Sequence, residues 1–142
     1  MAHILIVEAR FYADMADALV HGAQDVLEAA GHKVTRLAVP GVLEIPPAIK
    51  FADASGQFDA YVALGVVIRG ETSHYDIVCG ESARGLMDLA MHGIALGNGI
   101  QTVENAAQAW ARCNKDEKDK GGGAALAALR LLDIKSSMQG RA

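Results

Sequence analysis

The sequence contains little cysteine, and its spacing excludes two common kinds of site. Only Cys79 and Cys113 are present, far apart, with no C-x-x-C pair and no Cys/His spacing. A disulfide framework needs more cysteines, and a zinc site needs clustered ligands. We therefore interpret both residues as ordinary, buried thiols and expect no metal site.

Basic residues and long apolar runs are also scarce. With 13 Lys and Arg against 17 Asp and Glu, the net charge is -4, and no basic stripe for nucleic acid exists. Every apolar run is short and broken by glycine or charge, so none would cross a bilayer. Residues 1–7 lack the basic start and cleavage site of a signal peptide and are predicted to form a first strand. We expect a cytoplasmic protein that binds neither nucleic acid nor membrane.

Several nucleotide-binding and catalytic motifs are absent. The sequence has no G-x-x-x-x-G-K-[ST], no G-x-G-x-x-G after its first strand, no G-x-S-x-G and no H-E-x-x-H. Common nucleotide-binding, hydrolase and metalloprotease functions therefore lose support.

What the sequence does contain is apolar residues in short segments. It has 142 residues, of which 51% are hydrophobic, and a mean hydropathy of +0.18. This length predicts one domain, residues 1–142, with a real core. Because the interior of so small a monomer is limited, the apolar excess favours a homo-oligomer.

Strand-like and helix-like segments alternate along the chain, a pattern typical of βαβ units. We predict an α/β fold around a four-stranded parallel sheet. The expected strands are residues 3–8, 33–39, 59–68 and 94–102, the last interrupted at Gly97-Asn98-Gly99. The expected helices are residues 15–30, 44–56, 73–91, 104–113 and 122–134, with Gly31 closing the first.

The most informative stretch is residues 65–74, where a buried strand ends in polar residues. The apolar run up to residue 68 is followed by Arg69-Gly70-Glu71-Thr72-Ser73-His74. Gly70 breaks the strand, and Thr72 or Ser73 can cap a helix, so free backbone N–H groups gather there. Such groups bind anions, and His74 can give or take protons near neutral pH. This combination indicates catalysis on a phosphorylated substrate.

Other candidate residues follow the predicted strands or lie in the later helices, and parallel sheets place ligands at the carboxyl ends of their strands. Phe11 could stack on a planar ligand or be a helix-start contact. Glu44 could accept hydrogen bonds from hydroxyl groups or simply favour a helix N-terminus. Arg112 could clamp phosphate or stabilise a helix C-terminus, and Lys120 lies in a charge run that is solvated by default. Taken singly, each residue leaves both explanations open.

Four segments, in the right order, carry a resemblance to a known family. They are Ala9-Arg10-Phe11, residues 39–46 (VPGVLEIP), residues 63–74 (ALGVVIRGETSH) and residues 108–121. Together they resemble the lumazine synthase family along almost the whole chain. The resemblance implies a flavodoxin-like three-layer sandwich that assembles as pentamers, decamers or icosahedral shells of sixty subunits, with active sites between adjacent subunits.

The resemblance also implies a reaction in riboflavin biosynthesis. In it, 5-amino-6-ribitylamino-uracil condenses with 3,4-dihydroxy-2-butanone 4-phosphate to give 6,7-dimethyl-8-ribityllumazine, phosphate and water, without a cofactor. Phe11 would stack on the pyrimidine, Glu44 would accept hydrogen bonds from ribityl hydroxyls, and His74 would move protons. The full set implied for substrate binding is Phe11, Val42, Leu43, Glu44, Val66, Val67, Ile68, Asn98 and Lys120. The set implied for phosphate binding is Glu71, Thr72 and Arg112.

This sequence departs from the family pattern at two of the implied contacts. Tyr12 stands where many members have asparagine. Asn98 stands where many present an aromatic ring toward the neighbour's substrate, so hydrogen bonding would replace stacking there.

Two rival functions remain open on the same scaffold. A non-enzymatic flavin or lumazine carrier would use Phe11 and Glu44 and leave His74 and Arg112 idle. A shell-forming structural protein would use the apolar content for assembly alone. A phosphate-binding signalling domain is disfavoured, because the first strand lacks the acidic pair and the last strand lacks the lysine of a receiver.

Overall fold

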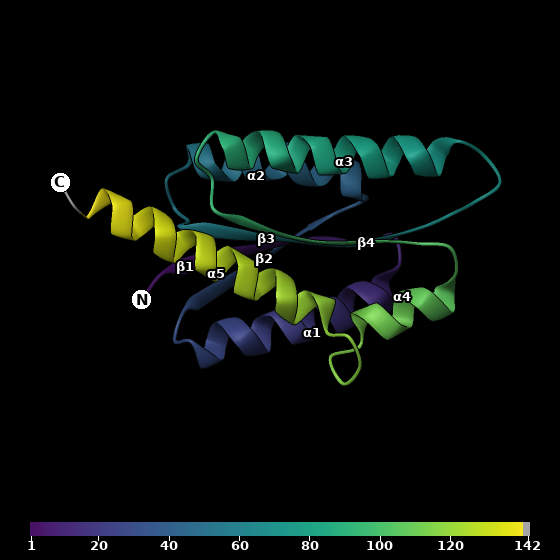
Figure 1. Cartoon of the computed structure of the whole chain (residues 1–142), viewed down its shortest axis with the longest axis horizontal. Coiled ribbons are helices and arrows are strands. Elements are labelled where there is room, and N and C mark those ends of the chain that lie inside the picture. The colour runs from purple at the N-terminus through teal and green to yellow at the C-terminus, as the bar shows by residue number, and fades with distance from the viewer. Residues whose placement is uncertain (141–142) are drawn as a thin grey trace.

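The sheet of this protein is four-stranded and entirely parallel, with strand order β2-β1-β3-β4. The computed structural model describes residues 1–140. Helices α2 and α3 cover one face of the sheet, and α1, α4 and α5 cover the other (Figure 1). This three-layer arrangement confirms the predicted flavodoxin-like α/β fold. The elements are β1 (His3–Ala9), α1 (Ala13–Ala29), β2 (Lys33–Val39), the 3₁₀ helix η1 (Val42–Glu44), α2 (Ile45–Ala54), β3 (Ala60–Ile68), α3 (His74–Met91), β4 (Leu96–Val103), α4 (Ala106–Cys113) and α5 (Lys120–Gln139).

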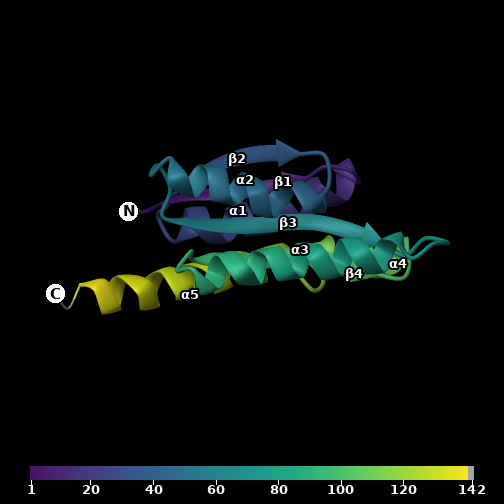
Figure 2. The ribbon, with the colours of Figure 1, turned by 90° about the horizontal axis from the view of Figure 1, so that it is seen from above.

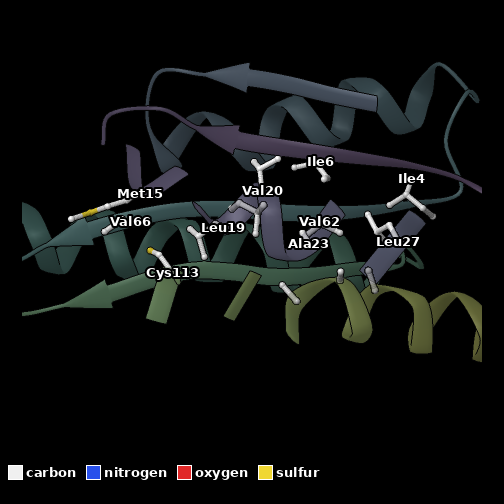
Figure 3. Packing of buried hydrophobic residues seen from close by; sticks show 14 of the residues in the cluster. Ile4, Ile6, Met15, Leu19, Val20, Ala23, Leu27, Val62, Val66 and Cys113 are labelled. Carbon is white, nitrogen blue, oxygen red and sulfur yellow. The ribbon is translucent and has the colours of Figure 1, made fainter. Parts of the chain in front are cut away.

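Side chains that alternate along β1 divide the core into two apolar clusters. Ile4 and Ile6 belong to the cluster under α1 and α5, whereas Leu5 and Val7 belong to the cluster under α2 and α3. Figure 3 shows the first cluster between the sheet and its covering helices. Because both faces of the sheet are covered, the strands read as nearly continuous apolar runs.

Strand β4 is continuous, so the interruption predicted at Gly97-Asn98-Gly99 is wrong. A Cβ on Gly97 would collide with the backbone of Ala124, and a Cβ on Gly99 would lie 3.0 Å from the Cβ of Ala124. The two glycines therefore let α5 pack directly onto the strand instead of breaking it. The register of β4 against β3 runs without a gap from Leu96 to Val103.

Helix α5 begins at Lys120, two residues earlier than predicted, and takes in the glycines at 121–123. A Cβ on Gly121 would collide with the backbone of Leu19 in α1, so close helix packing requires glycine there. The end of α1 was predicted correctly, since Gly31 has a φ of 83°. The ends of α3 and α4 match the predicted residues, and the remaining helix boundaries differ by one or two residues, except that α5 runs on to Gln139. Figure 2 shows α5 projecting past the sheet.

Both cysteines are free thiols, but only Cys113 is buried as expected. Cys113 is fully buried, and burial raises its pKa to about 11, whereas Cys79 is half-buried. Within residues 1–140, no helix has the length and apolar character that crossing a membrane requires.

Candidate active site

A pocket of about 350 Å³ opens at the carboxyl edge of the sheet. Its walls come from the segments that follow β1, β2 and β3 and from the first turns of α3. The parallel sheet thus brings together segments that are far apart in the sequence. The sequence-predicted residues that line the pocket are Phe11, Val42, Leu43, Glu44, Val66, Val67, Ile68, Thr72 and His74.

One wall of the pocket is an overhanging end of β3. Pairing of β1 with β3 stops at Glu8 and Leu64, whereas pairing of β3 with β4 continues to Ile68 and Val103. On the side of β3 that faces away from β4, the backbone of residues 65–68 therefore has no neighbouring strand. Strand pairing leaves these backbone groups free to hydrogen-bond the edge of a planar ligand.

Phe11 presents an exposed aromatic ring to the pocket. The side chain is 76% exposed and belongs to neither apolar cluster. Its one aromatic neighbour in the described chain is Tyr12, whose ring meets it edge-on with centroids 4.9 Å apart and an interplanar angle of 82°. Tyr12 is half-buried against the cluster under α1 and also lines the pocket. A ring held in this way is suited to stacking on a flat ligand.

Glu44 closes η1 immediately before α2. Its Oε1 atom accepts a hydrogen bond from the backbone N–H of Gly41 at 2.9 Å, which fixes the carboxylate at the pocket. The lone pairs not used in this bond can accept hydrogen bonds from ligand hydroxyl groups. Val42 is buried beneath this turn, whereas Leu43 is 40% exposed beside Glu44.

The segment between β3 and α3 exposes backbone N–H groups. Within residues 1–140, no protein atom accepts a hydrogen bond from the N–H groups of Gly70, Glu71 or Thr72. The Oγ1 atom of Thr72 accepts the N–H of His74 at 3.3 Å, where α3 begins. Free amides together with the positive end of a helix form an anion site. His74 is exposed and lines the same pocket, whereas the Glu71 side chain does not line it.

Tyr75 lines the pocket and had no role predicted from the sequence. The guanidinium carbon of Arg69 lies 4.2 Å from the centroid of the Tyr75 ring, and its Nε donates a 2.7 Å hydrogen bond to Glu104. Burial raises the pKa of Tyr75, so the hydroxyl stays protonated near neutral pH. In the sequence, the only sign of a role for Tyr75 is that it follows His74. A strand-to-helix turn does not reveal which of two consecutive residues faces a pocket.

Besides Glu71, three predicted residues lie outside this pocket. Arg112 is in the last turn of α4, where its Nη1 donates to the carbonyl of Gln108 at 3.0 Å. Lys120 is exposed at the start of α5, on the side of the sheet opposite α3. Asn98 lies on the edge strand β4 in a second, apolar pocket between α3 and α5. In the described part of the chain, no three His, Cys, Asp or Glu side chains cluster as metal ligands would.

These features define a class of protein. It is a flavodoxin-like α/β protein whose pocket offers an aromatic ring, a strip of unpaired backbone and an anion site to a small molecule. Comparison with known proteins narrows this class. The family profile of 6,7-dimethyl-8-ribityllumazine synthase matches residues 1–136, and the chain belongs to that family.

Relatives with this name are similar to the chain over nearly its whole length. The protein from Sphingopyxis alaskensis is 59% identical, over 95% of this chain and 96% of the relative. The protein from Novosphingobium aromaticivorans is 61% identical, over 95% of this chain and 97% of the relative. A third, named 6,7-dimethyl-8-ribityllumazine synthase 1, from Rhizobium meliloti, is 57% identical, over 96% of this chain and 93% of the relative.

Proposed function

We propose that this protein is a transferase of riboflavin biosynthesis. It condenses 5-amino-6-ribitylamino-uracil with 3,4-dihydroxy-2-butanone 4-phosphate to 6,7-dimethyl-8-ribityllumazine. The observation that carries the proposal is that Phe11, unpaired strand backbone, free amides and His74 meet in one pocket at the end of β3. Membership of the family over residues 1–136 supports the same activity.

The uracil reactant would occupy the part of the pocket nearest β1 and β2. Its ring stacks on Phe11, and its polar edge meets Val66, Val67 and Ile68, where the backbone groups of β3 that face away from β4 have no strand partner. The ribityl chain lies along η1, where Val42 and Leu43 give apolar contact and Glu44 accepts hydrogen bonds from hydroxyl groups. The ring, the polar edge and the ribityl chain of the uracil reactant thus each meet a protein group of matching chemistry.

The phosphorylated ketone would lie beside the start of α3. The N–H groups of Glu71 and Thr72 bind its phosphate, and Arg112 supplies the permanent positive charge. His74 takes and returns protons as the amine attacks the carbonyl and one water leaves, as phosphate is eliminated, and as ring closure by the ribitylamino nitrogen releases a second water. Holding both reactants in one pocket adds an effective molarity of about 10⁵ M or more.

A second copy of the chain would complete the site. Arg112, Lys120 and Asn98 do not line the pocket that holds His74, although each is implied to bind the substrates. The second, apolar pocket runs along β4 between α3 and α5 and includes Met87, Met91 and Leu131. Such an apolar face on an edge strand favours contact with another subunit. We therefore propose a cytoplasmic homo-oligomer of single-domain subunits, built from pentamers.

The enzymatic activity is tested by mixing both reactants and following the fluorescence of the lumazine product. The expected result is product formation well above the uncatalysed rate, with a large loss in His74→Ala. Tight binding of the product without any rate above the uncatalysed reaction would identify a carrier. If the protein neither binds the product nor forms it above the uncatalysed rate, only the function of a shell-forming structural protein remains.

The shared site is tested by mixing two impaired variants, His74→Ala and Arg112→Ala, under conditions that exchange subunits, and assaying at a ketone phosphate concentration well below the KM of Arg112→Ala. If the two residues come from different subunits, about a quarter of the sites in a random ring recover both native residues. If both come from the same subunit, no site recovers, and the proposal of a shared site fails. Light scattering on the native protein gives the subunit number, and a single-chain mass would exclude the oligomer.

A further inference from the structure

Glu8 is a buried carboxylate near the carboxyl end of an inner strand of the sheet, outside the pocket. It lies on β1, between β2 and β3, and is 2% exposed. Its Oε1 accepts from Arg10 Nη1 at 2.6 Å and from Arg36 Nη2 at 2.7 Å, and its Oε2 accepts from Arg36 Nε at 2.7 Å. Arg10 Nη1 also donates to Asp17 Oδ1 in α1 at 2.9 Å. One carboxylate therefore ties together β1, β2 and, through Arg10, α1.

The protonation of Glu8 matches this geometry. Burial works to raise the pKa of its carboxyl, but the hydrogen bonds and charges of Arg36 and Arg10 outweigh burial and hold the pKa below its usual value. The carboxylate is therefore charged near neutral pH and bonds both guanidinium groups firmly. A buried charge in a sheet of aliphatic residues is costly, so its presence calls for a role that an apolar residue would not fill.

Arg10 joins this cluster to the pocket. Ala9, Phe11 and Tyr12 line the pocket, whereas Arg10 does not. Its side chain turns to the other face of the sheet, where Glu8 and Asp17 lie, and its backbone N–H donates to the carbonyl of Val39 at 3.0 Å. The residue next to Phe11 is thus anchored at both its backbone and its side chain, while the Phe11 ring itself is largely exposed.

We propose that Arg10, held by Glu8, is a positioning residue that fixes the Phe11 ring for stacking on the pyrimidine reactant. The inference rests on the proposed function. Without the anchor, residues 10–12 would have to be ordered when the ligand binds, and part of the stacking free energy would be lost. The effect falls on the pyrimidine reactant alone, because the phosphorylated ketone meets a different segment of the pocket.

Arg36 provides a matched control. It bonds the same carboxylate, with two hydrogen bonds where Arg10 has one, but it lies on β2 and is not joined to the Phe11 segment. Arg10→Met and Arg36→Met each remove one guanidinium from Glu8. Both should lower the stability of the fold. Only Arg10→Met should change binding in the pocket.

The test measures KM for each reactant and the Kd of the product 6,7-dimethyl-8-ribityllumazine, read from its fluorescence. Arg10→Met should raise the Kd of the product and the KM of the uracil by about three- to tenfold, the range that one aromatic contact spans. KM for the ketone phosphate should stay unchanged. Arg36→Met should leave both KM values and the Kd at native levels. Equal effects of the two variants would overturn the proposal.

A double variant distinguishes positioning from general weakening. If Arg10 acts through the Phe11 ring, Arg10→Met/Phe11→Leu should bind the product no more weakly than Phe11→Leu alone. Additive losses would show that Arg10 acts elsewhere. If Arg10→Met does not fold, the variant Arg10→Lys, which keeps the positive charge, takes the place of Arg10→Met in every measurement. The Kd of the product needs no catalysis, so it tests Arg10 even if the native chain proves to be a carrier.

Discussion

Adding a single methyl group at Gly65 should displace the turn that carries Glu44. Gly65 lies in the overhanging part of β3, and a Cβ built on it would be 2.6 Å from Cγ1 of Val42 and 3.1 Å from the Cβ of Ala9. Carbon atoms pack at about 3.5–4.0 Å, so Val42 must move by about 1 Å. Val42 is 4% exposed and its branched side chain has little rotamer freedom. The displacement therefore passes to the backbone of η1.

Two quantities follow from this geometry for Gly65→Ala. Overpacking of a filled core costs about 1–3 kcal/mol of unfolding free energy. A shift of about 1 Å in groups that position a reactant can cost up to about 10²-fold in rate. Because η1 carries Leu43 and Glu44, kcat/KM for the uracil reactant should fall by about 10- to 10²-fold. KM for the ketone phosphate should change much less.

Gly80→Ala is the control for this substitution. Gly80 is exposed in α3, and a Cβ there would meet nothing within 4 Å. Replacing glycine by alanine inside a helix should stabilise the fold by about 1 kcal/mol, and the kinetics should stay native. Urea unfolding and steady-state lumazine formation measure both effects. If Gly65→Ala keeps native kcat/KM, the rigid contact between β3 and η1 does not set the position of the binding turn.

Three further predictions concern the acid–base group, the phosphate and the buried carboxylate. His74→Ala should lower kcat by about 10² while leaving the subunit number unchanged, as measured by kinetics and light scattering. Arg112→Ala should raise KM for the ketone phosphate with little effect on uracil binding, and an equal loss for both reactants would contradict its role. The pKa of Glu8 is lower in the folded chain than in the unfolded chain, so its contribution to stability is present above the unfolded pKa and is lost as pH falls through the folded pKa. Below pH 4.5, the unfolding free energy of Glu8→Gln should therefore fall less steeply than that of the native chain, as urea titrations can test.

The strands and the pocket-lining segments could be predicted because their signals are local. An unbroken apolar run identifies β3 as a strand covered on both faces, and the switch to polar residues after Ile68 marks its carboxyl end. The rule that parallel strands collect ligands at this end then brings Phe11, Glu44 and His74 into one pocket.

Features that depend on contacts between distant segments could not be predicted in this way. Gly97 and Gly99 resemble turn residues in the sequence, and only the approach of α5 explains why glycine is needed within a strand. The unpaired backbone beyond Leu64 depends on the relative lengths of β1 and β3 and on their register. Glu8 shows the same limit, since nothing in the sequence pairs it with Arg36 on another strand.

The topology of the sheet explains why the pocket lies where it does. Strand order β2-β1-β3-β4 reverses between β1 and β3, so the chain leaves β1 for α1 on one face and leaves β3 for α3 on the other. The two departing segments separate at this point and leave a crevice, which is where doubly wound sheets bind ligands. The overhang of β3 deepens the crevice, and its backbone becomes a binding edge because β1 ends early. Arg112 follows β4, one strand further from this reversal, and does not line the pocket of its own chain. Under the proposed function, a role for Arg112 on the phosphate therefore requires a neighbouring subunit, and catalysis would then depend on assembly.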